Sequence, residues 1–200
     1  MADILVLYDT RKGANEALAR EICRGVDAVE GMSARLRTVP EVSSVTETVA
    51  AAVPDSGPPY ATHEDLEECA GLVLGSPTHF GNMSASMKHF LDGTVAVWFG
   101  GALAGKPAGL FTSSSSLHGG QESTLLTMAV PLLHHGMVIV GIPYTEAALS
   151  TTTGGGTPYG ATHVTWNRKT VDLSDDEKSL ARTLGKRVAT FAGRLARTES

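Results

Sequence analysis

Short apolar runs alternate with helical patterns along this chain. The runs lack a strict alternation of apolar and polar residues, which is typical of strands buried on both faces. They cover residues 3–8, 34–39, 71–75, 107–113 and 137–142, whereas residues 14–29, 84–97 and 121–135 have the pattern of helices. This alternation predicts an α/β fold in which a parallel sheet of five strands carries helices on both faces.

The clearest helix signal lies near the C-terminus. Ser174 and Glu177 form a capping box, and apolar residues then recur every three or four positions. These residues are Leu180, Leu184, Val188, Phe191 and Leu195. The pattern predicts a helix that covers one face of the sheet. Five strands in this order suit a doubly wound, flavodoxin-like arrangement, in which ligands bind at the carboxyl ends of the strands.

Two stretches interrupt the alternation of strands and helices. Residues 40–62 are rich in Val, Ser, Pro and Thr, and residues 145–167 are rich in Gly and Thr. We interpret both as long loops, the second being an insertion before the last helix. Loops of this length usually serve function or assembly. No internal repeat or linker is visible, so residues 1–200 are predicted to form a single domain.

Composition and charge exclude several classes of protein. A net charge of −5 and the absence of a Lys/Arg run disfavour nucleic-acid binding. No apolar stretch is long enough to span a membrane, which predicts a cytoplasmic protein. The only cysteines, Cys23 and Cys69, are far apart and form no ligand-like spacing. They predict inert thiols rather than a disulfide framework or a metal site.

In a parallel sheet, the loops after the first, third and fourth strands emerge at the same edge. The first loop contains Thr10, Gly13 and Asn15, which supply a hydroxyl, a flexible turn and a cap-like side chain where a helix begins. Such a loop is a ready-made phosphate site of backbone N–H groups and a positive helix end. The alternative is an ordinary capped helix start, and the loop lacks the G-x-G-x-x-G pattern of dinucleotide sites.

The second loop follows the third strand and combines a rigid turn, polar donors and an aromatic ring. Its residues are Pro77, Thr78, His79, Phe80, Gly81 and Asn82. An aromatic residue beside hydrogen-bond donors suits a flat, heterocyclic ligand. The alternatives are a core contact for Phe80 and a solvated loop histidine for His79.

The third loop offers hydroxyls and accessible backbone directly after the fourth strand. It contains Ser113, Ser114, Ser115, Ser116, Leu117, His118 and Gly119. These groups could surround the edge of the same ligand. A flexible serine linker is the alternative, although the position between a strand and a helix disfavours it.

These loops, read in order, resemble the WrbA family of flavodoxin-like NAD(P)H:quinone oxidoreductases. The resemblance is carried by SPTHFGNMSASMKHFLD (76–92), Trp98, GGQE (119–122), HHGMVIV (134–140) and GGTPYGAT (155–162). It runs along nearly the whole chain, and the first and last of these motifs are far more specific than a lone glycine pattern.

The resemblance implies FMN as the cofactor. Its phosphate would bind in the first loop, at Thr10, Arg11, Lys12, Gly13, Ala14 and Asn15. Its ring would lie between the second loop, from Pro77 to Asn82, and the third loop, from Ser113 to Gly119. The resemblance also implies that His134 lies at the flavin pocket, where it could act catalytically, and that Trp98 lines the substrate cavity. Without the resemblance, His134 could be a structural histidine and Trp98 a core or interface aromatic.

The implied activity is the two-electron reduction of quinones to hydroquinones by NADH or NADPH. Family members are tetramers with pockets at subunit contacts, so a homotetramer is expected. Two other interpretations stay open. The protein could be a flavodoxin-type one-electron carrier, although its modest charge provides little electrostatic steering. It could also be a redox-sensitive interaction protein, for which the composition names no partner.

One residue departs from the family pattern. Where relatives commonly carry an aromatic residue in the first loop, this chain has Lys12. An aromatic ring can stack on nicotinamide, whereas an ammonium group cannot stack and attracts phosphate or carboxylate instead. The third loop departs as well, since it is richer in serine than in glycine. The affinity for the hydride donor is therefore in question.

Overall fold

The computed structural model describes residues 2–42, 57–166 and 171–196. The chain forms a parallel sheet in the order β2-β1-β3-β4-β5, with an additional strand, β6, beside β4. The strands are β1 (Ala2–Tyr8), β2 (Met32–Thr38), β3 (Gly71–Pro77), β4 (Pro107–Ser114), β5 (Val138–Ile139) and β6 (Ala161–Val164). The predicted five-stranded parallel sheet with flavodoxin-like order is confirmed, and β6 is a sixth strand that was not predicted.

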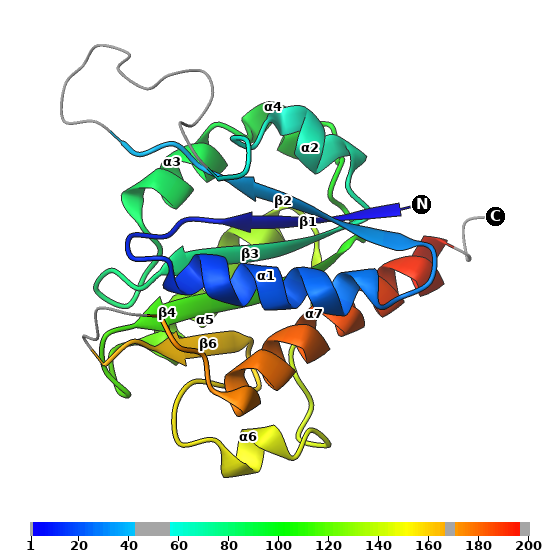
Figure 1. The fold of residues 1–200 in the computed structure, drawn as a ribbon. Helices are drawn as coiled ribbons and strands as arrows, with labels where there is room; N and C mark the ends of the chain where they lie inside the picture. The colour runs from blue at the N-terminus through cyan, green and yellow to red at the C-terminus, as the bar shows by residue number, and fades with distance from the viewer. Residues whose placement is uncertain (1, 43–56, 167–170, 197–200) are drawn as a thin grey trace.

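Helices cover both faces of the sheet, as predicted (Figure 1). They are α1 (Ala14–Asp27), α2 (His63–Glu68), α3 (Ala85–Asp92), α4 (Val95–Phe99), α5 (Gln121–His134), α6 (Ala148–Thr151) and α7 (Asp175–Ala196). The sheet has one hydrophobic core on each face, and alternate residues of β1 point into one or the other. Ile4 and Val6 pack with residues of α1 and α7, whereas Leu5 and Leu7 pack with residues of α3 and α5. In the part of the chain that is described, no helix is both long and apolar enough to cross a membrane.

Two expectations about the second strand and the 84–97 helix need correction. The predicted helix 84–97 is two helices, because α3 ends at the cap residue Gly93 and α4 follows. The edge strand β2 is half-buried throughout and not buried on both faces, since its outer side has no neighbouring strand. Arg35 and Arg37 on β2 instead form ion pairs with acidic residues that include Asp65. The interior strands β1, β3 and β4 are mostly buried, as predicted.

The fifth strand also differs from its prediction. Residues 137–142 pair with β4 only at Val138 and Ile139, next to Pro107 and Ala108. Further along, Ile142 N–H donates to the Pro158 carbonyl (2.9 Å). The chain therefore leaves β4, and β6 pairs with Phe111–Ser114 in its place. The stretch 145–167 is consequently not only a loop, because it supplies α6 and a strand of the sheet. Of the first predicted loop, 40–62, residues 43–56 lie outside the described part of the chain.

Helix α7 begins with the predicted capping box. Glu177 N–H donates to Ser174 Oγ (3.2 Å), and Ser174 N–H donates to Glu177 Oε2 (2.8 Å). Leu180, Leu184 and Val188 are buried against the sheet. Phe191 is half-buried and Leu195 is largely exposed, so the apolar face of the helix weakens toward its C-terminus.

Both cysteines are unpaired thiols. Burial raises the pKa of Cys23 to about 11 and raises the pKa of Cys69 above its usual value. A thiol with a raised pKa forms little of the reactive thiolate at neutral pH, so both side chains suit the inert role predicted for them.

Helices α1 and α7 cross in close contact because glycine lies at the crossing. A Cβ atom at Gly185 would lie 2.2 Å from the Ile22 carbonyl oxygen, where backbone cannot move aside. We expect Gly185→Ala to lower the free energy of unfolding by about 3 kcal/mol, measured by urea denaturation. Gly193→Ala on the same helix is the control, because its Cβ would meet only the flexible end of Met32. That variant should be as stable as the wild type or more stable, since alanine favours helix. Equal losses in both variants would contradict this account of the crossing.

Candidate functional site

The first loop joins β1 to α1 at the carboxyl edge of the sheet and has the form of an anion site. Gly13 occupies the N-cap position with φ 82°, a left-handed conformation that favours glycine. Its N–H donates to Thr10 Oγ1 (3.0 Å), so the hydroxyl proton of Thr10 is free to point outward. Arg11 and Lys12 are exposed at the tip of the loop. Backbone N–H groups at the start of a 14-residue helix therefore face the same edge as two cations.

Two oxygen atoms beneath this loop lack partners. Asn15 is fully buried and its Nδ2 donates to the Asp9 carbonyl (2.9 Å), but its Oδ1 accepts no hydrogen bond in the described structure. Asp9 Oδ2 is buried and unpartnered in the same way. Buried acceptors of this kind are rare, since each one costs free energy unless a donor reaches it. A ligand with hydrogen-bond donors, such as hydroxyl groups, would satisfy these two oxygens.

The second loop presents Phe80 on a tight turn. His79 N–H donates to the Asn82 carbonyl (2.8 Å), and Asn82 N–H donates to the His79 carbonyl (3.0 Å). Both central residues are left-handed, with φ 53° at Phe80 and 76° at Gly81, which is the geometry of a type I′ turn. Phe80 is fully exposed, which excludes the core contact considered above. Strained backbone that exposes an aromatic ring is characteristic of functional sites.

The third loop lies beside the second and is ordered by hydrogen bonds. Thr78 N–H donates to the Ser113 carbonyl (3.0 Å), and Thr78 Oγ1 bonds with the Gly120 carbonyl and with Thr124. Ser113 and Ser114 belong to β4, so the loop itself starts later than predicted. Ser115, Ser116, Leu117 and His118 are exposed and Gly119 is half-buried. This ordered turn excludes the flexible-linker interpretation.

The structure brings His134 and Trp98 together but places them away from the first loop. Trp98 Nε1 donates to the His134 carbonyl (2.8 Å). Helix α5 starts beside the third loop and ends at His134, and its 14 residues span about 20 Å. Within one protomer, His134 and Trp98 are therefore near the far end of α5.

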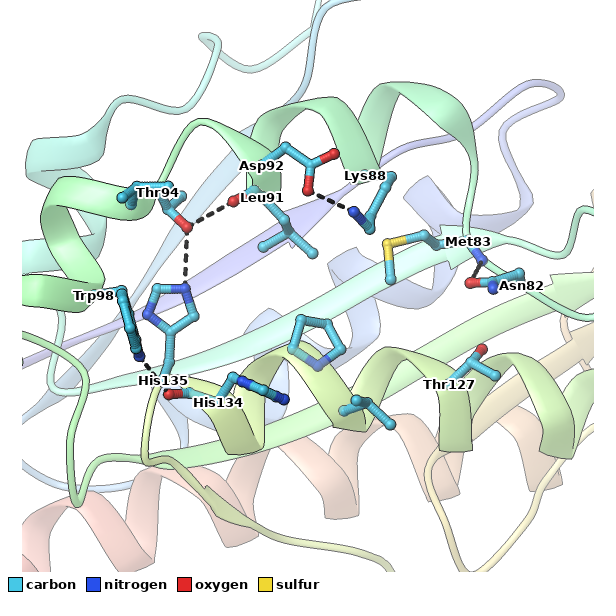
Figure 2. A pocket seen from close by; sticks show the side chains of 13 residues that line it. Asn82, Met83, Lys88, Leu91, Asp92, Thr94, Trp98, Thr127, His134 and His135 are labelled. Atoms are coloured by element: carbon cyan, nitrogen blue, oxygen red, sulfur yellow. Dashed lines mark hydrogen bonds and ion pairs between the residues drawn. The ribbon is translucent and has the colours of Figure 1, made fainter.

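A groove of about 540 Å³ runs between α5 and the helices α3 and α4. Figure 2 shows Trp98, His134 and His135 at one end and Asn82 and Thr127 at the other. The wall is mainly apolar and includes Leu91, Val95, Val130 and Pro131. Thr127 Oγ1 lies 3.4 Å from the Gly81 carbonyl oxygen, so the groove opens next to the second loop.

His135 has a defined tautomer. Thr94 Oγ1 donates to the Leu91 carbonyl (2.7 Å), so it must accept from His135 Nε2, which lies 3.0 Å away. His135 Nδ1 is then an acceptor, buried and without a partner among the described residues. Burial, helped by the neighbouring His134, lowers the pKa of His135 below its usual value. No group of three or more metal-ligating side chains occurs in the described ranges.

Sequence reasoning missed part of this arrangement. Asp9 and Asn15 Oδ1 carry no local signal, since only the fold shows that they are buried without partners. The groove was missed because its residues come from α3, α4 and α5. The three loops themselves were found because parallel strands bring their carboxyl ends to one edge.

The profile of the NADPH-dependent FMN reductase family matches residues 3–150 of this chain. The chain belongs to this family. A protein of Solidesulfovibrio magneticus named NAD(P)H dehydrogenase (quinone) is 41% identical over 204 residues, which cover 96% of this chain and 98% of the relative. A protein of Trichlorobacter lovleyi with the same name is 41% identical over 202 residues, covering 98% and 99%.

Solved structures show the same fold as this member of the FMN reductase family. A WrbA-like flavodoxin from Agrobacterium tumefaciens superimposes with a TM-score of 0.68, at 20% identity, over 97% of this chain and 99% of its own. The family relationship inferred from the sequence motifs is confirmed by the family match and the two relatives, and the WrbA-like structure shares the fold.

The first loop suits FMN, the cofactor in the family's name. The helix start and the cations match a phosphate, and the unpartnered oxygens of Asp9 and Asn15 match ribityl hydroxyls, which can donate to them. The turn at Phe80 and the third loop supply aromatic and hydrogen-bonding groups at the same edge of the sheet. These groups suit the flat ring of FMN.

Proposed function

We propose that this protein is an FMN-dependent NAD(P)H:quinone oxidoreductase that reduces quinones to hydroquinones by two electrons. The observation that carries the proposal is the carboxyl edge of the sheet, where an anion site, buried acceptors and an exposed aromatic turn follow one another. The two relatives that share 41% of their residues with the chain are named for the same activity. FMN, when bound, would supply the hydride chemistry.

The residues of the chain have separate tasks in this proposal. Thr10, Arg11, Lys12, Gly13, Ala14 and Asn15 would hold the phosphate, while Asp9 and Asn15 would accept from the ribityl chain. The second and third loops would orient the ring, with Pro77, Thr78, His79, Phe80, Gly81 and Asn82 on one side. Ser113, Ser114, Ser115, Ser116, Leu117, His118 and Gly119 would lie on the other side. His134 would hold or deliver a proton to the quinone oxygen, and Trp98 would bound the quinone.

We further propose that the site is completed by a second copy of the chain, in a homotetramer. Helix α5 is apolar on both sides, since Leu125 and Leu132 are buried inward while Leu126, Val130 and Leu133 are about half exposed outward. Val95, Trp98 and Phe99 of α4 are exposed as well. Apolar surface of this kind on a folded domain is typical of an interface. A partner packed on it would explain how His134 and Trp98 of one copy serve the loops of another.

The described fold adds no observation in favour of the two rival interpretations, a one-electron carrier and a redox-sensitive interaction protein. A one-electron carrier would need a strongly charged docking face, whereas the net charge is only −5 with 16 basic residues in the chain. Two unpaired thiols are what a reducing compartment would give, so we keep the cytoplasm as the proposed location.

Anaerobic stopped-flow absorbance tests the proposed activity. FMN-loaded protein is mixed with NADH or NADPH and then with benzoquinone. We expect rapid two-electron bleaching of the flavin band followed by full recovery when the quinone is added. Slow bleaching, or reduction that stops after one electron, would favour the carrier instead. If His134→Ala keeps full turnover, the proton-transfer role of His134 is rejected.

Lys12 provides a prediction about the donor. Lys12→Tyr is expected to lower the apparent Michaelis constant for NADH by about threefold, because a ring in the first loop can stack on the nicotinamide dinucleotide. Steady-state kinetics with benzoquinone measures it. Lys12→Gln is the matched control, since it removes the charge without adding a ring. An equal decrease in both variants would show that charge, not stacking, is responsible.

A further inference from the structure

A buried chain of hydrogen bonds joins the 145–167 insertion to the third loop. Gln121, the first residue of α5, donates from Nε2 to the Leu117 carbonyl (2.9 Å). Its Oε1 accepts from Thr162 Oγ1 of β6. Thr162 Oγ1 in turn accepts from Gly156 N–H (2.7 Å). Gln121 is 3% exposed and Thr162 is 1% exposed, so water does not compete for these groups.

Each bond in this chain can run in only one direction. The Leu117 carbonyl can only accept, so the Gln121 amide nitrogen faces it and Oε1 faces Thr162. Oε1 can only accept, so the Thr162 hydroxyl donates its proton to Gln121 and accepts from Gly156 N–H. Such a chain specifies one arrangement of its members, and each bond polarises the next.

The end of this hydrogen-bond chain at Gly156 is anchored to α7, through the neighbouring Gly155. Gly155 N–H donates to Glu177 Oε1 (2.8 Å), and His163 Nδ1 lies 3.0 Å from both oxygens of the same carboxylate. Both positions require glycine. A Cβ atom at Gly155 would lie 2.0 Å from the Thr162 carbonyl oxygen, and Gly156 has a φ of 121°, a conformation that favours glycine. The motif GGTPYGAT therefore packs the insertion closely enough to reach Gln121 of the motif GGQE.

The other end of the hydrogen-bond chain, at the Leu117 carbonyl, reaches an exposed part of the third loop. Within the described structure, the other bonds of Ser115–Gly119 are local, such as Ser114 Oγ to the Ser116 carbonyl (2.7 Å) and Gly119 N–H to the same carbonyl (3.1 Å). The side chain of Gln121 is thus a second link from this turn to the buried framework, in addition to Ser114 of β4. Losing it would leave the turn held at Ser116 alone, so that Leu117 could shift without disturbing the sheet.

We propose that Gln121 and Thr162 are positioning residues for the flavin site. They hold the third loop in the shape that receives the cofactor, so the 145–167 insertion acts as a brace for a loop that it does not itself form. This inference rests on the proposed function, because it assumes that the third loop contacts FMN.

Substitution of Thr162 tests the brace. Thr162→Val keeps the size of the side chain but leaves Gly156 N–H and Gln121 Oε1 without partners. We expect the Kd for FMN, measured by quenching of FMN fluorescence well below the melting temperature, to rise about tenfold. Thr162→Ser retains the hydroxyl and should restore FMN binding to within about twofold of wild type.

Thr157→Val is the matched control. Thr157 is buried in the same insertion, but it takes no part in the hydrogen bonds that join Gly156, Thr162, Gln121 and Leu117. Its Oγ1 donates to the Gly160 carbonyl (3.0 Å) and accepts from Tyr159 N–H (3.2 Å). We expect this variant to melt at a lower temperature while binding FMN as the wild type does. Equal weakening of FMN binding in Thr157→Val and Thr162→Val would overturn the proposal, because it would show only a general loosening of the fold.

A second variant covers the case in which Thr162→Val does not fold. Gln121→Met keeps the length of the side chain and removes both polar atoms, and it should raise the Kd for FMN to a similar extent. Wild-type affinity in either folded variant would refute the positioning role. Failure of the wild-type protein to bind FMN at all would refute the proposed function instead, so the two failures can be told apart.

Discussion

Leu133→Glu is expected to reduce quinone turnover by about a hundredfold while leaving FMN binding intact. Leu133 is 58% exposed on the outer side of α5, so a charge there does not disturb the fold of one protomer. In the proposed tetramer it would prevent a second copy from packing on this helix. His134 and Trp98 lie near the far end of α5, and separated protomers could not supply them to the loops that we propose to hold FMN in a neighbour.

Light scattering, FMN titration and benzoquinone turnover on the same sample measure this outcome. Val42→Glu is the control, since it introduces the same charge at an exposed apolar residue outside α4 and α5. It should retain both assembly and turnover. A monomeric Leu133→Glu protein with full turnover would show that one protomer contains a complete site.

Glu177→Ala is expected to lower the free energy of unfolding by about 4 kcal/mol. Glu177 is 3% exposed and accepts from Ser174 N–H, Gly155 N–H and the ring of His163. Its removal leaves these buried donors without an acceptor and breaks one of the two hydrogen bonds of the α7 capping box, the one from Ser174 N–H. Asp175→Ala, which removes an exposed acidic residue from the same helix turn, should cost less than about 0.5 kcal/mol. Urea denaturation of the two variants makes the comparison.

The same carboxylate should make stability depend on pH. Burial raises the pKa of Glu177, but the donors from His163 and the backbone outweigh burial, so its pKa lies below the ordinary 4.5. A group with a lowered folded-state pKa contributes stability above its unfolded pKa and loses that contribution as the pH falls. The unfolding free energy of the wild type should therefore decline as the pH drops below 4.5, and the decline should be smaller in Glu177→Ala. Parallel pH profiles would contradict this assignment.

What the sequence predicted well was local or periodic. The capping box of α7 needs only Ser174 and Glu177, three residues apart, and the loops follow from the order of strands and helices. Strand β6 was not predicted because its four residues are too short to show a pattern beside a glycine-rich turn. The break at Gly93 was missed because α3 and α4 together have the length of one helix.

The same distinction between local and long-range features applies to the candidate site. The residues of the first loop are contiguous and were predicted as a group. The contact between Gln121 and Thr162 joins positions 41 residues apart, so no local pattern reports it. The separation of His134 from the first loop depends on the length and direction of α5. The resemblance implied that His134 lies at the flavin pocket, but it did not tell whether that pocket belongs to the same copy of the chain.

The divided edge beside β4 has a consequence for how copies of this protein can join. A long open strand at the rim of a sheet invites another chain to extend it, and repetition of that step produces fibres. Here the rim is shared by β5, with two residues, and β6, with four, so neither offers a template of useful length. Extension of the sheet at this rim is therefore disfavoured, and in the proposed tetramer the copies would join through the apolar sides of α4 and α5, where contacts through side chains favour closed assemblies of fixed size.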